Sequence, residues 1–345
     1  MSAFCVQFPV IETVKANSKA LGGVHCPVCE SECTAPPLYR YTVEQAAAHF
    51  CPPTRNPERN RRLRNCIARL WGRSHCLILR CDQCGFGFGY PFVGGDEEFY
   101  GILLEQKDYP IWRWDYDVAL TEAIEKFTGG KILDIGAGVG NFLRRLDETW
   151  ECYAVEGSEL TRRELEGSRI RVFRDLEEAA NSHAGTFQVV TLFQVLEHVA
   201  EFDFVLKQCR KLLAPGGRLV VTVPEGEAMI RQEMVTGCAD MPPNHLSKWT
   251  PASLRRVLTR IGFECGDPIP EPSSLNSLRA NLHMRVSADA ADSNSISAQA
   301  YRVKNKPLRI AALSLLAVPA FLRLLPNGRH LLAGGAFAIV SVVPS

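Results

Sequence analysis

The chain has 345 residues, of which 46% are hydrophobic and 22% are charged. This length accommodates two domains, each with a core of its own. The 39 basic and 38 acidic residues give a net charge of +1, so the overall charge gives no reason to expect binding to nucleic acid or to an acidic surface. The thirteen cysteines are odd in number, and residues 1–20 lack the basic start and long apolar run of a secretory signal. We therefore expect a reducing, cytoplasmic environment and no disulfide framework.

Two Cys-x-x-Cys pairs lie near the N-terminus, at Cys26–Cys29 and Cys81–Cys84. Each pair lies in a turn-forming segment, and four thiolates suit the closed tetrahedral geometry of a structural zinc ion. A redox pair would be expected at a strand-to-helix junction, whereas the second pair runs into a glycine-rich, ribbon-like sequence. The sequence therefore predicts one structural Zn2+ on Cys26, Cys29, Cys81 and Cys84. Five nearby side chains remain alternative ligands, namely Cys33, Cys51, Cys66, Cys76 and His75.

Residues 55–73 combine apolar residues at helical spacing with many arginines. The apolar set is Leu63, Cys66, Ile67, Leu70 and Trp71, and the basic set is Arg55, Arg59, Arg61, Arg62, Arg64, Arg69 and Arg73. The pattern predicts an amphipathic helix with a solvated arginine face. A site for nucleic acid or an acidic partner is the alternative, but the segment lacks the interleaved aromatic residues on which single strands stack.

The most informative segment is a short apolar run, residues 132–135, that meets three glycines in the spacing G-x-G-x-G. The run predicts a buried strand, and residues 141–146 after the glycines predict a helix. A tight glycine turn at this place brings the backbone close to a ligand and offers free amide groups.

The identity of that ligand follows from two neighbouring residues. The dinucleotide fingerprint G-x-G-x-x-G requires a third glycine where this chain has Asn141. Asp134, two residues before the first glycine, would repel a pyrophosphate but can accept hydrogen bonds from an ammonium group. Both residues favour S-adenosylmethionine over a nicotinamide dinucleotide.

Further strands and helices alternate along the chain after this turn. Strands are predicted at 151–156, 170–173, 187–193 and 218–223, and helices at 159–166, 199–213 and 251–261. Glu156 ends the second strand, where nucleotide-type sites place a carboxylate on ribose hydroxyls. Ser158 follows as a plausible helix N-cap. The alternation predicts a doubly wound α/β domain with a parallel sheet covered on both faces.

Over residues 131–266 the chain resembles the class I S-adenosylmethionine-dependent methyltransferases. The matching segments are 133–140, Glu156, 187–190, 194–198 and 213–217, with Gln188 where the family usually has an acid. The resemblance implies a Rossmann-like, mostly parallel seven-stranded sheet and S-adenosyl-L-methionine as cofactor. The residues that it assigns to the cofactor are Asp134, Gly136, Ala137, Gly138, Gly140, Glu156, Gly157, Asp175, Leu176, Phe193 and Gln194.

The N-terminal region resembles the zinc-binding domain that precedes the catalytic domain in a subgroup of these methyltransferases, several of which act on sugars or other small metabolites. Both cysteine pairs, Gly85 and Pro91 match that arrangement, as does the aromatic and acidic span 96–120. The aromatic residues of the span either close over the cofactor or acceptor or fill the seam between two domains. They are Phe99, Tyr100, Tyr109, Trp112, Trp114 and Tyr116.

The acceptor is expected beside residues 241–250. In similar small-molecule enzymes a histidine in this segment acts as the base, and His245 matches its position. Asn244 stands where some sugar methyltransferases have an acid. His245 is therefore the predicted catalytic base, with Asn244 and Trp249 orienting and covering the acceptor. The alternative is a histidine that packs in the loop and bonds to the backbone.

The C-terminal part contains two uncharged stretches of thirteen residues, 310–322 and 331–343. Each is shorter than the ~20 apolar residues of a spanning helix. The first predicts a helix over 310–325 that is kinked at Pro319, and the second predicts the last strand of the sheet. Peripheral membrane contact through residues 310–325 is the alternative to a core or interface helix.

The expected domains are a zinc-binding domain over 1–95, connector helices over 96–130 and a methyltransferase domain over 131–345, with an insertion around 267–330. Within that insertion the polar segment 271–306 is predicted to be loose. The expected activity is methyl transfer from S-adenosylmethionine to a small-molecule acceptor such as a sugar or another metabolite, at a carbon, oxygen or nitrogen atom. The alternatives are an RNA or protein methyltransferase that uses the zinc domain as its reader, and a nicotinamide-dependent oxidoreductase.

Overall fold

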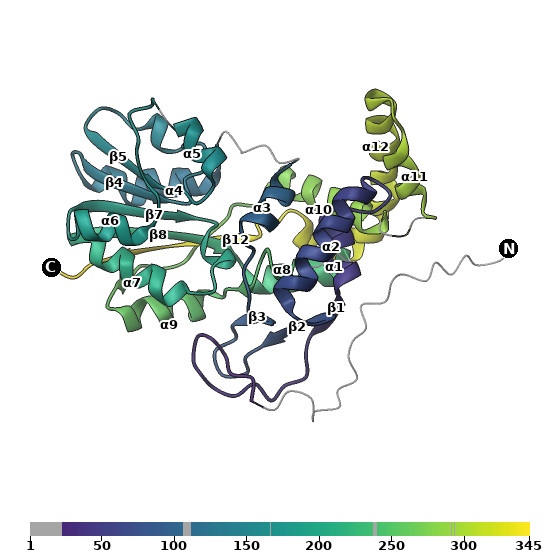
Figure 1. Cartoon of the computed structure of the whole chain (residues 1–345), viewed down its shortest axis with the longest axis horizontal. Coiled ribbons are helices and arrows are strands. Elements are labelled where there is room, and N and C mark those ends of the chain that lie inside the picture. The colour runs from purple at the N-terminus through teal and green to yellow at the C-terminus, as the bar shows by residue number, and fades with distance from the viewer. Residues whose placement is uncertain (1–22, 106–111, 166, 237–239, 291, 293) are drawn as a thin grey trace. The chain divides into compact units, whose positions relative to one another are not determined.

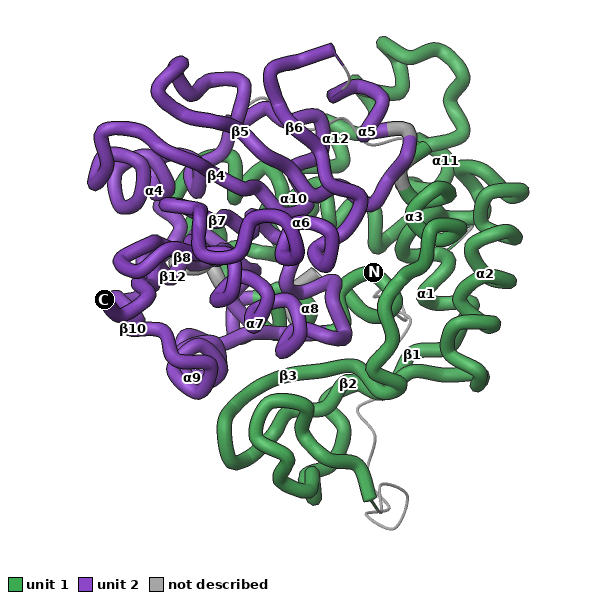
Figure 2. The backbone as a smooth tube through the Cα atoms, turned by 60° about the vertical axis from the view of Figure 1, so that its left-hand side comes forward, with its two compact units in different colours: residues 1–105, 229–246, 273–333 green, residues 106–228, 247–272, 334–345 purple. Residues whose placement is uncertain are grey.

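The computed structural model describes residues 23–105, 112–165, 167–236, 240–290, 292 and 294–345. The chain groups into two compact units (Figure 2). Unit 1 comprises residues 1–105, 229–246 and 273–333, and unit 2 comprises residues 106–228, 247–272 and 334–345. Unit 1 thus takes in two segments that the sequence analysis assigned to the methyltransferase domain. The N-terminal residues 1–20 and Tyr109 lie outside the described residues.

Unit 2 is built on one mostly parallel sheet (Figure 1). Its strands are β4 (Gly130–Ile135), β5 (Trp150–Val155), β6 (Arg171–Phe173), β7 (Phe187–Phe193), β8 (Leu213–Pro224), β10 (Glu264–Cys265), β11 (Ile269–Pro270) and β12 (Ala336–Val342). The order is β6-β5-β4-β7-β8-β12-β10, with the two-residue strand β11 beside β12. Strands β4 to β8 run parallel, whereas β12 is antiparallel to β8, β10 and β11. The predicted doubly wound sheet and its late C-terminal strand are confirmed, with β11 as an eighth strand.

Helices cover both faces of this sheet because neighbouring residues of each strand point to opposite sides. Ile132 belongs to the core that includes Tyr116 and Ala119 of α4 (Trp114–Glu122). On the other face, Tyr153 stacks on Phe173 and meets His183 of α6 (Leu176–His183). The remaining helices of unit 2 are α5 (Glu159–Leu165), α7 (Phe202–Leu212) and α9 (Pro251–Ile261), and the unit also contains the two-residue strand β9 (Ser247–Lys248).

Gln188 connects two strands at their starting ends. Its Oε1 atom accepts a 2.6 Å hydrogen bond from the backbone nitrogen of Lys131. A side chain at Gly130 would meet this amide, because a Cβ atom there would lie 2.2 Å from Gln188 Oε1. Gln188 therefore holds β7 against β4 without the negative charge that the family usually places here.

In unit 1, the strands β1 (Tyr39–Thr42), β2 (His75–Arg80) and β3 (Gly87–Tyr90) pair in antiparallel fashion, with β2 between the other two. Its helices are α1 (Val43–Phe50), α2 (Pro57–Trp71), α3 (Glu97–Leu104), α10 (Leu275–Asp289), α11 (Ile296–Arg302), α12 (Lys306–Leu324) and α13 (Gly328–Leu331). Helix α8 (Gly226–Thr236) contains the division between the units. The prediction of a loose segment over 271–306 is wrong, because α10 and α11 occupy most of it. Leu275, Leu278 and Leu282 of α10 stand at helical spacing, but the many serine and alanine residues of the segment favour the prediction of a loop.

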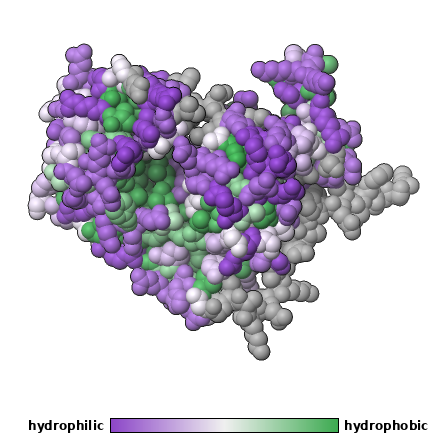
Figure 3. Space-filling view, in the orientation of Figure 1, coloured by the Kyte–Doolittle hydropathy of each residue, from purple (hydrophilic) through white to green (hydrophobic). Residues whose placement is uncertain are grey.

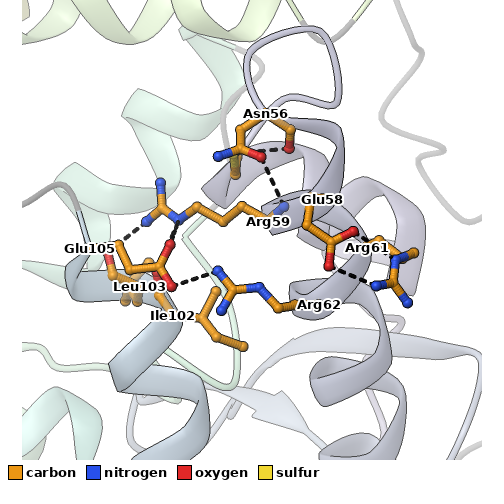
Figure 4. Close-up of polar contacts among 9 residues, drawn as sticks. Asn56, Glu58, Arg59, Arg61, Arg62, Ile102, Leu103 and Glu105 are labelled. Carbon is orange, nitrogen blue, oxygen red and sulfur yellow. Dashed lines mark hydrogen bonds and ion pairs between the residues drawn. The ribbon is translucent and has the colours of Figure 1, made fainter.

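The arginine-rich helix α2 is confirmed, but its basic face is only partly solvated. The Arg59 side chain is buried and donates to the Ile102 and Leu103 carbonyl oxygens at 2.9 and 2.7 Å, which completes the last turn of α3 (Figure 4). Other arginines are paired with acids: Arg61 with Glu58, Arg62 with Glu105, and Arg69 with both Asp96 and Glu98. These pairs neutralise much of the charge that a nucleic-acid site would need.

Candidate functional site

The glycine turn follows the carboxyl end of β4, and all three of its glycines have positive φ angles. A Cβ atom on Gly136 would lie 2.6 Å from Val195, and one on Gly140 would lie 2.8 Å from both Leu165 and Ile170. The Gly140 amide donates to the Ala137 carbonyl at 3.0 Å. Both the backbone conformation and the close packing therefore require glycine at these positions.

The segment after the turn differs from the prediction. Residues 141–146 do not form an α-helix; they contain the 3-10 helix η3 (Leu143–Arg145). The three glycines with positive φ angles and the closely packed Phe142 and Leu143 bend this segment onto the sheet. A helix of one turn adds little dipole, so the turn lacks the helix N-terminus that favours a phosphate group.

Glu156 fixes the turn from the neighbouring strand. Its Oε2 atom accepts from the Gly138 amide at 2.9 Å, and its Oε1 atom accepts from the Ser158 amide at 2.8 Å. The residue is 9% exposed. Each carboxylate oxygen has a second lone pair, so the group can still accept hydrogen bonds from ligand hydroxyls. The next residue, Gly157, is exposed, and its carbonyl accepts from Arg162 at 2.8 Å.

Two further buried acids lie near Glu156. Asp134 is 3% exposed and accepts a 2.7 Å hydrogen bond from the Thr191 hydroxyl. Burial raises the pKa of Asp134 to about 7; the Thr191 bond and the Arg113 charge oppose the shift, and Asp115 and Glu156 add to it. The carboxylate is therefore unusually easy to protonate near neutral pH.

Asp115 is a third buried acid, and no motif in the sequence indicated it as a site residue. It is fully buried and is held by the Arg113 guanidinium, whose Nε donates at 3.0 Å, and by the Thr222 hydroxyl at 2.8 Å. Only the acidic character of the connector 96–120 pointed to it. Asp134 thus lies within electrostatic reach of two further carboxylates, Asp115 and Glu156, and of one guanidinium, that of Arg113. Such an excess of negative charge suits a ligand with positive charge.

Gln194 and Phe193 end strand β7. Gln194 has a φ angle of 57°, which is unusual for a residue with a side chain, and its amide donates to the Thr222 carbonyl at 3.0 Å. The Phe193 ring lies 4.9 Å from that of Tyr116 and 5.0 Å from that of Phe142. Phe142 was not predicted as part of this aromatic group. Burial raises the pKa of Tyr116 to about 12, so its hydroxyl is neutral.

Asp175 and Leu176 lie where α6 begins. The Asp175 carboxylate accepts from the Glu178 amide at 2.9 Å and so acts as the helix N-cap. Backbone hydrogen bonding from Glu178 lowers the pKa of Asp175, and Leu176 is buried. The N-cap explains Asp175 without a ligand, and its assignment to the cofactor stays a prediction.

The aromatic residues of the connector belong to two different cores. Phe99 is fully buried in unit 1, with its ring 5.3 Å from that of Tyr100. Tyr116 is buried in unit 2, with its ring 5.2 Å from that of Trp112. Most of these residues therefore serve the packing of the unit in which they lie.

The four predicted zinc ligands lie together in unit 1. Their sulfur atoms are all within 4.8 Å of one another, with Cys26 Sγ 3.6 Å from Cys84 Sγ and Cys29 Sγ 3.4 Å from Cys81 Sγ. The two pairs also have the same backbone geometry. The amide four residues after the first cysteine donates back to that cysteine's carbonyl at 2.9 Å in both pairs, and the residue in this position, Glu30 or Gly85, has a φ angle of 62° or 72°. Such matched turns aim both thiols of each pair at one point, as a tetrahedral metal requires.

His245 lies in unit 1, at the end of segment 229–246. Its Nδ1 atom is 2.5 Å from Oδ2 of Asp240, and the Asn244 amide donates to Oδ1 of the same acid at 3.3 Å. Asp240 was missed because it precedes the histidine by five residues rather than one. A carboxylate at this distance from Nδ1 can orient a histidine ring and stabilise its imidazolium form. Trp249 is fully buried in unit 2, with its ring 5.1 Å from that of Phe202, so it is a core residue and not an acceptor cover.

Residues 114–266 match a family model described as a methyltransferase domain. The chain is 29% identical over 160 residues to the ubiquinone biosynthesis O-methyltransferase of Psychrobacter arcticus and 32% identical over 158 residues to that of Psychrobacter cryohalolentis. Each alignment covers 41% of this chain and 62% of the relative, so the chain spans less than two thirds of these curated relatives. Among solved structures, a SAM-dependent methyltransferase from Archaeoglobus fulgidus is 16% identical, with a TM-score of 0.44 over 71% of this chain and 99% of that one.

Proposed function

We propose that residues 114–266, which match a family model described as a methyltransferase domain, work as a class I S-adenosylmethionine-dependent methyltransferase and transfer a methyl group to a hydroxyl group of a small molecule. The names of the relatives support an oxygen acceptor. The near-neutral charge of the chain and the arginine–acid pairs on α2 give less support to an RNA acceptor.

The observation that carries the proposal is the charge of the buried side chains at and near the glycine turn. S-adenosylmethionine has a positive sulfonium and a positive ammonium group, against one carboxylate. Asp115, Asp134 and Glu156 supply negative charge, and Arg113 is a candidate partner for the carboxylate. A nicotinamide dinucleotide would bring two phosphates to these buried acids and would be repelled.

Methyl transfer requires the acceptor oxygen to attack the methyl carbon in line with the sulfur. The carbon–sulfur bond breaks, and its electron pair stays on the sulfur, which becomes neutral. The sheet unit holds the donor and so lowers the entropic cost of the encounter. We assign to His245 the removal of the hydroxyl proton, through Nε2, and to Asp240 the positioning of the ring and the stabilisation of its charged form.

The four cysteines support a structural zinc ion in unit 1. Four thiolates leave no open coordination position, so the metal would bind the two cysteine turns together and take no part in chemistry. This group of four ligands does not include the alternatives His75, Cys51, Cys66 and Cys76. Cys33 is buried nearby and remains the alternative ligand.

Calorimetry with S-adenosylhomocysteine, S-adenosylmethionine and NAD tests the cofactor. We expect binding of both sulfur compounds and none of NAD, and the reverse would refute the assignment. Incubation with methyl-labelled S-adenosylmethionine and either a metabolite extract, total RNA or a protein extract tests the acceptor class. Label in small molecules supports the proposal, whereas label confined to RNA or protein would show that the macromolecular alternative is correct.

A further inference from the structure

Helix α12 (Lys306–Leu324) carries apolar side chains on two opposite faces. Its inner face packs on α10 and α11 within unit 1, and Ala320 and Leu324 are buried there at 3% and 1% exposure. The outer face is a stripe of exposed apolar residues, spaced by seven, three, four and three positions. The residues of this outer stripe are Leu308 (63% exposed), Leu315 (73%), Val318 (60%), Leu322 (60%) and, directly after the last residue of the helix, Leu325 (47%).

This exposure separates α12 from a helix of a protein core. Among the described residues, α12 is the one helix that is long and apolar enough to cross a membrane by length and composition. Its most apolar stretch of 18 residues has a mean hydropathy of 1.6, yet only 11% of that stretch is buried. Contiguous exposed apolar stripes of this kind mark interaction surfaces. Figure 3 shows hydrophobic and hydrophilic side chains side by side on this part of unit 1, at the upper right of the view.

The charge of the same region is strongly one-sided. Residues 293–345 contain six Lys and Arg and no Asp or Glu, although the whole chain has a net charge of +1. The six basic residues are Arg302, Lys304, Lys306, Arg309, Arg323 and Arg329. Lys304 and Lys306 are exposed at the beginning of α12. The nearest acid along α10, Asp289, is paired with Arg285 at 2.8 Å and with Arg323 at 3.3 Å.

We propose that the outer stripe of α12 binds the surface of a membrane that contains anionic lipids. The helix lies in the plane of the interface, with the stripe among the upper acyl chains and Lys304 and Lys306 at the headgroups. Apolar burial and attraction to anionic lipid add together in such helices. A second copy of the chain is the less suitable partner, because it would bring six further basic residues against the first six.

The neighbours of α12 favour a helix on the membrane over one that crosses it. Helix α10, on which α12 packs, carries Arg279, Arg285 and Asp289, and Asp289 is paired with Arg323 of α12. Asn281 of α10 also donates to the Leu331 carbonyl at 3.1 Å. Crossing the bilayer would bring these charges into hydrocarbon or detach α12 from its partners, and either change is costly.

Sedimentation of the full chain with lipid vesicles tests the proposal. Wild-type protein should bind vesicles of equal parts phosphatidylcholine and phosphatidylglycerol, and bind pure phosphatidylcholine much more weakly. Leu315→Gln/Leu322→Gln should lower binding to the anionic vesicles by at least about tenfold, because two apolar side chains are lost from the interface. Lys304→Gln/Lys306→Gln should lower it by about tenfold, and should change binding to neutral vesicles little.

The matched control is Leu275→Gln/Ile296→Gln, which removes two apolar residues of unit 1 that are 77% and 70% exposed but lie outside the stripe. This variant should bind like the wild type, and all variants should keep the wild-type melting temperature. Equal binding by the stripe variant and the control would overturn the proposal, as would absence of wild-type binding at low salt. A dimer that the stripe variant dissociates would instead identify a second copy as the occupant. Protein that resists extraction from vesicles by alkaline carbonate would show that α12 crosses the bilayer.

Discussion

The backbone amide of Gly138 donates a 2.9 Å hydrogen bond to the carboxylate of Glu156. This bond joins the glycine turn after β4 to the end of β5, two places eighteen residues apart in the chain. One acid thereby shapes the backbone of the turn and remains able to accept hydrogen bonds from a ligand. Glu156 should matter both for the shape of the site and for affinity.

Glu156→Ala should weaken binding of S-adenosylmethionine by roughly tenfold or more, because hydrogen bonds to a charged group contribute about 1.5–3 kcal/mol. Isothermal titration calorimetry measures the dissociation constant. The matched control is Glu151→Ala, which removes an acid from the same strand whose side chain is 54% exposed. An unchanged dissociation constant for Glu156→Ala would show that this acid does not contact the ribose.

Asp134 should make cofactor binding depend on pH. Burial raises its pKa to about 7, so the group loses its charge as the pH falls below 7, and the cationic cofactor loses an attractive partner. Affinity for S-adenosylmethionine should rise between pH 6 and pH 8, and binding at pH 7 should release a proton. Calorimetry in two buffers with different ionisation enthalpies measures this proton.

The raised pKa of Asp134 affects the stability of the free protein in the direction opposite to its effect on cofactor affinity. The folded-state pKa of Asp134 lies above the unfolded value of about 3.9, so the contribution of this group to stability falls as the pH rises from about 4 to 7 and stays low above 7. Asp134→Asn should therefore raise the melting temperature of the free protein at pH 8 while weakening cofactor binding. The titratable groups that interact with Asp134 are Arg113, Asp115, Glu156 and Tyr116. They are unchanged in this variant, so a difference in melting temperature reports the loss of the Asp134 charge. A variant that melts lower than the wild type at pH 8 would contradict the prediction.

Metal analysis of the purified protein should find about one zinc per chain. Cys81→Ser should lose most of that zinc and lower the melting temperature, because the ion connects the two cysteine turns. Cys51→Ser, which changes a buried cysteine of the same unit outside the cluster, should keep its zinc. Full zinc content and full stability in Cys81→Ser would show that the ligand set is different.

His245→Ala should lower turnover by about 10²–10⁴-fold once an acceptor is known, with cofactor affinity nearly unchanged. Added imidazole should restore part of the activity if the lost group is a base, which a merely structural role would not allow. His49→Ala, at a half-buried position of α1, serves as the control. A loss smaller than about threefold would mean that transfer depends on positioning alone.

Asp240→Asn tests whether the neighbouring acid positions His245. Turnover should fall while the KM for the acceptor changes little, because the ring and not the substrate loses its partner. Asp240→Glu should retain more activity than Asp240→Asn, since it keeps the charge near Nδ1. Equal losses in both variants, together with a lower melting temperature, would assign Asp240 to the structure of the loop.

Several elements could be predicted from sequence because their signals are local. Strand β7 occupies the predicted residues 187–193, since an apolar run with a polar flank is buried wherever the sheet forms. Helix α9 occupies the predicted 251–261, because Thr250 and Ser253 form a capping box and Pro251 suits the first turn. The glycine turn and the two Cys-x-x-Cys pairs likewise have fixed spacings that their backbone conformations require.

The tertiary structure decided which charged groups are buried and what they contact. Asp115 became a site candidate because Arg113 and Thr222 hold it, and Thr222 lies 107 residues away in the chain. Arg59 is buried although six similar arginines lie on the same segment, because two carbonyl groups of α3 come within its reach. Asp240 lies beside His245 because of the path of the loop that joins them, and no periodic pattern in the sequence predicts that path. The sequence alone determines whether each side chain is apolar, polar or charged. The free energy of burying a charge depends on partners that only the folded chain brings together.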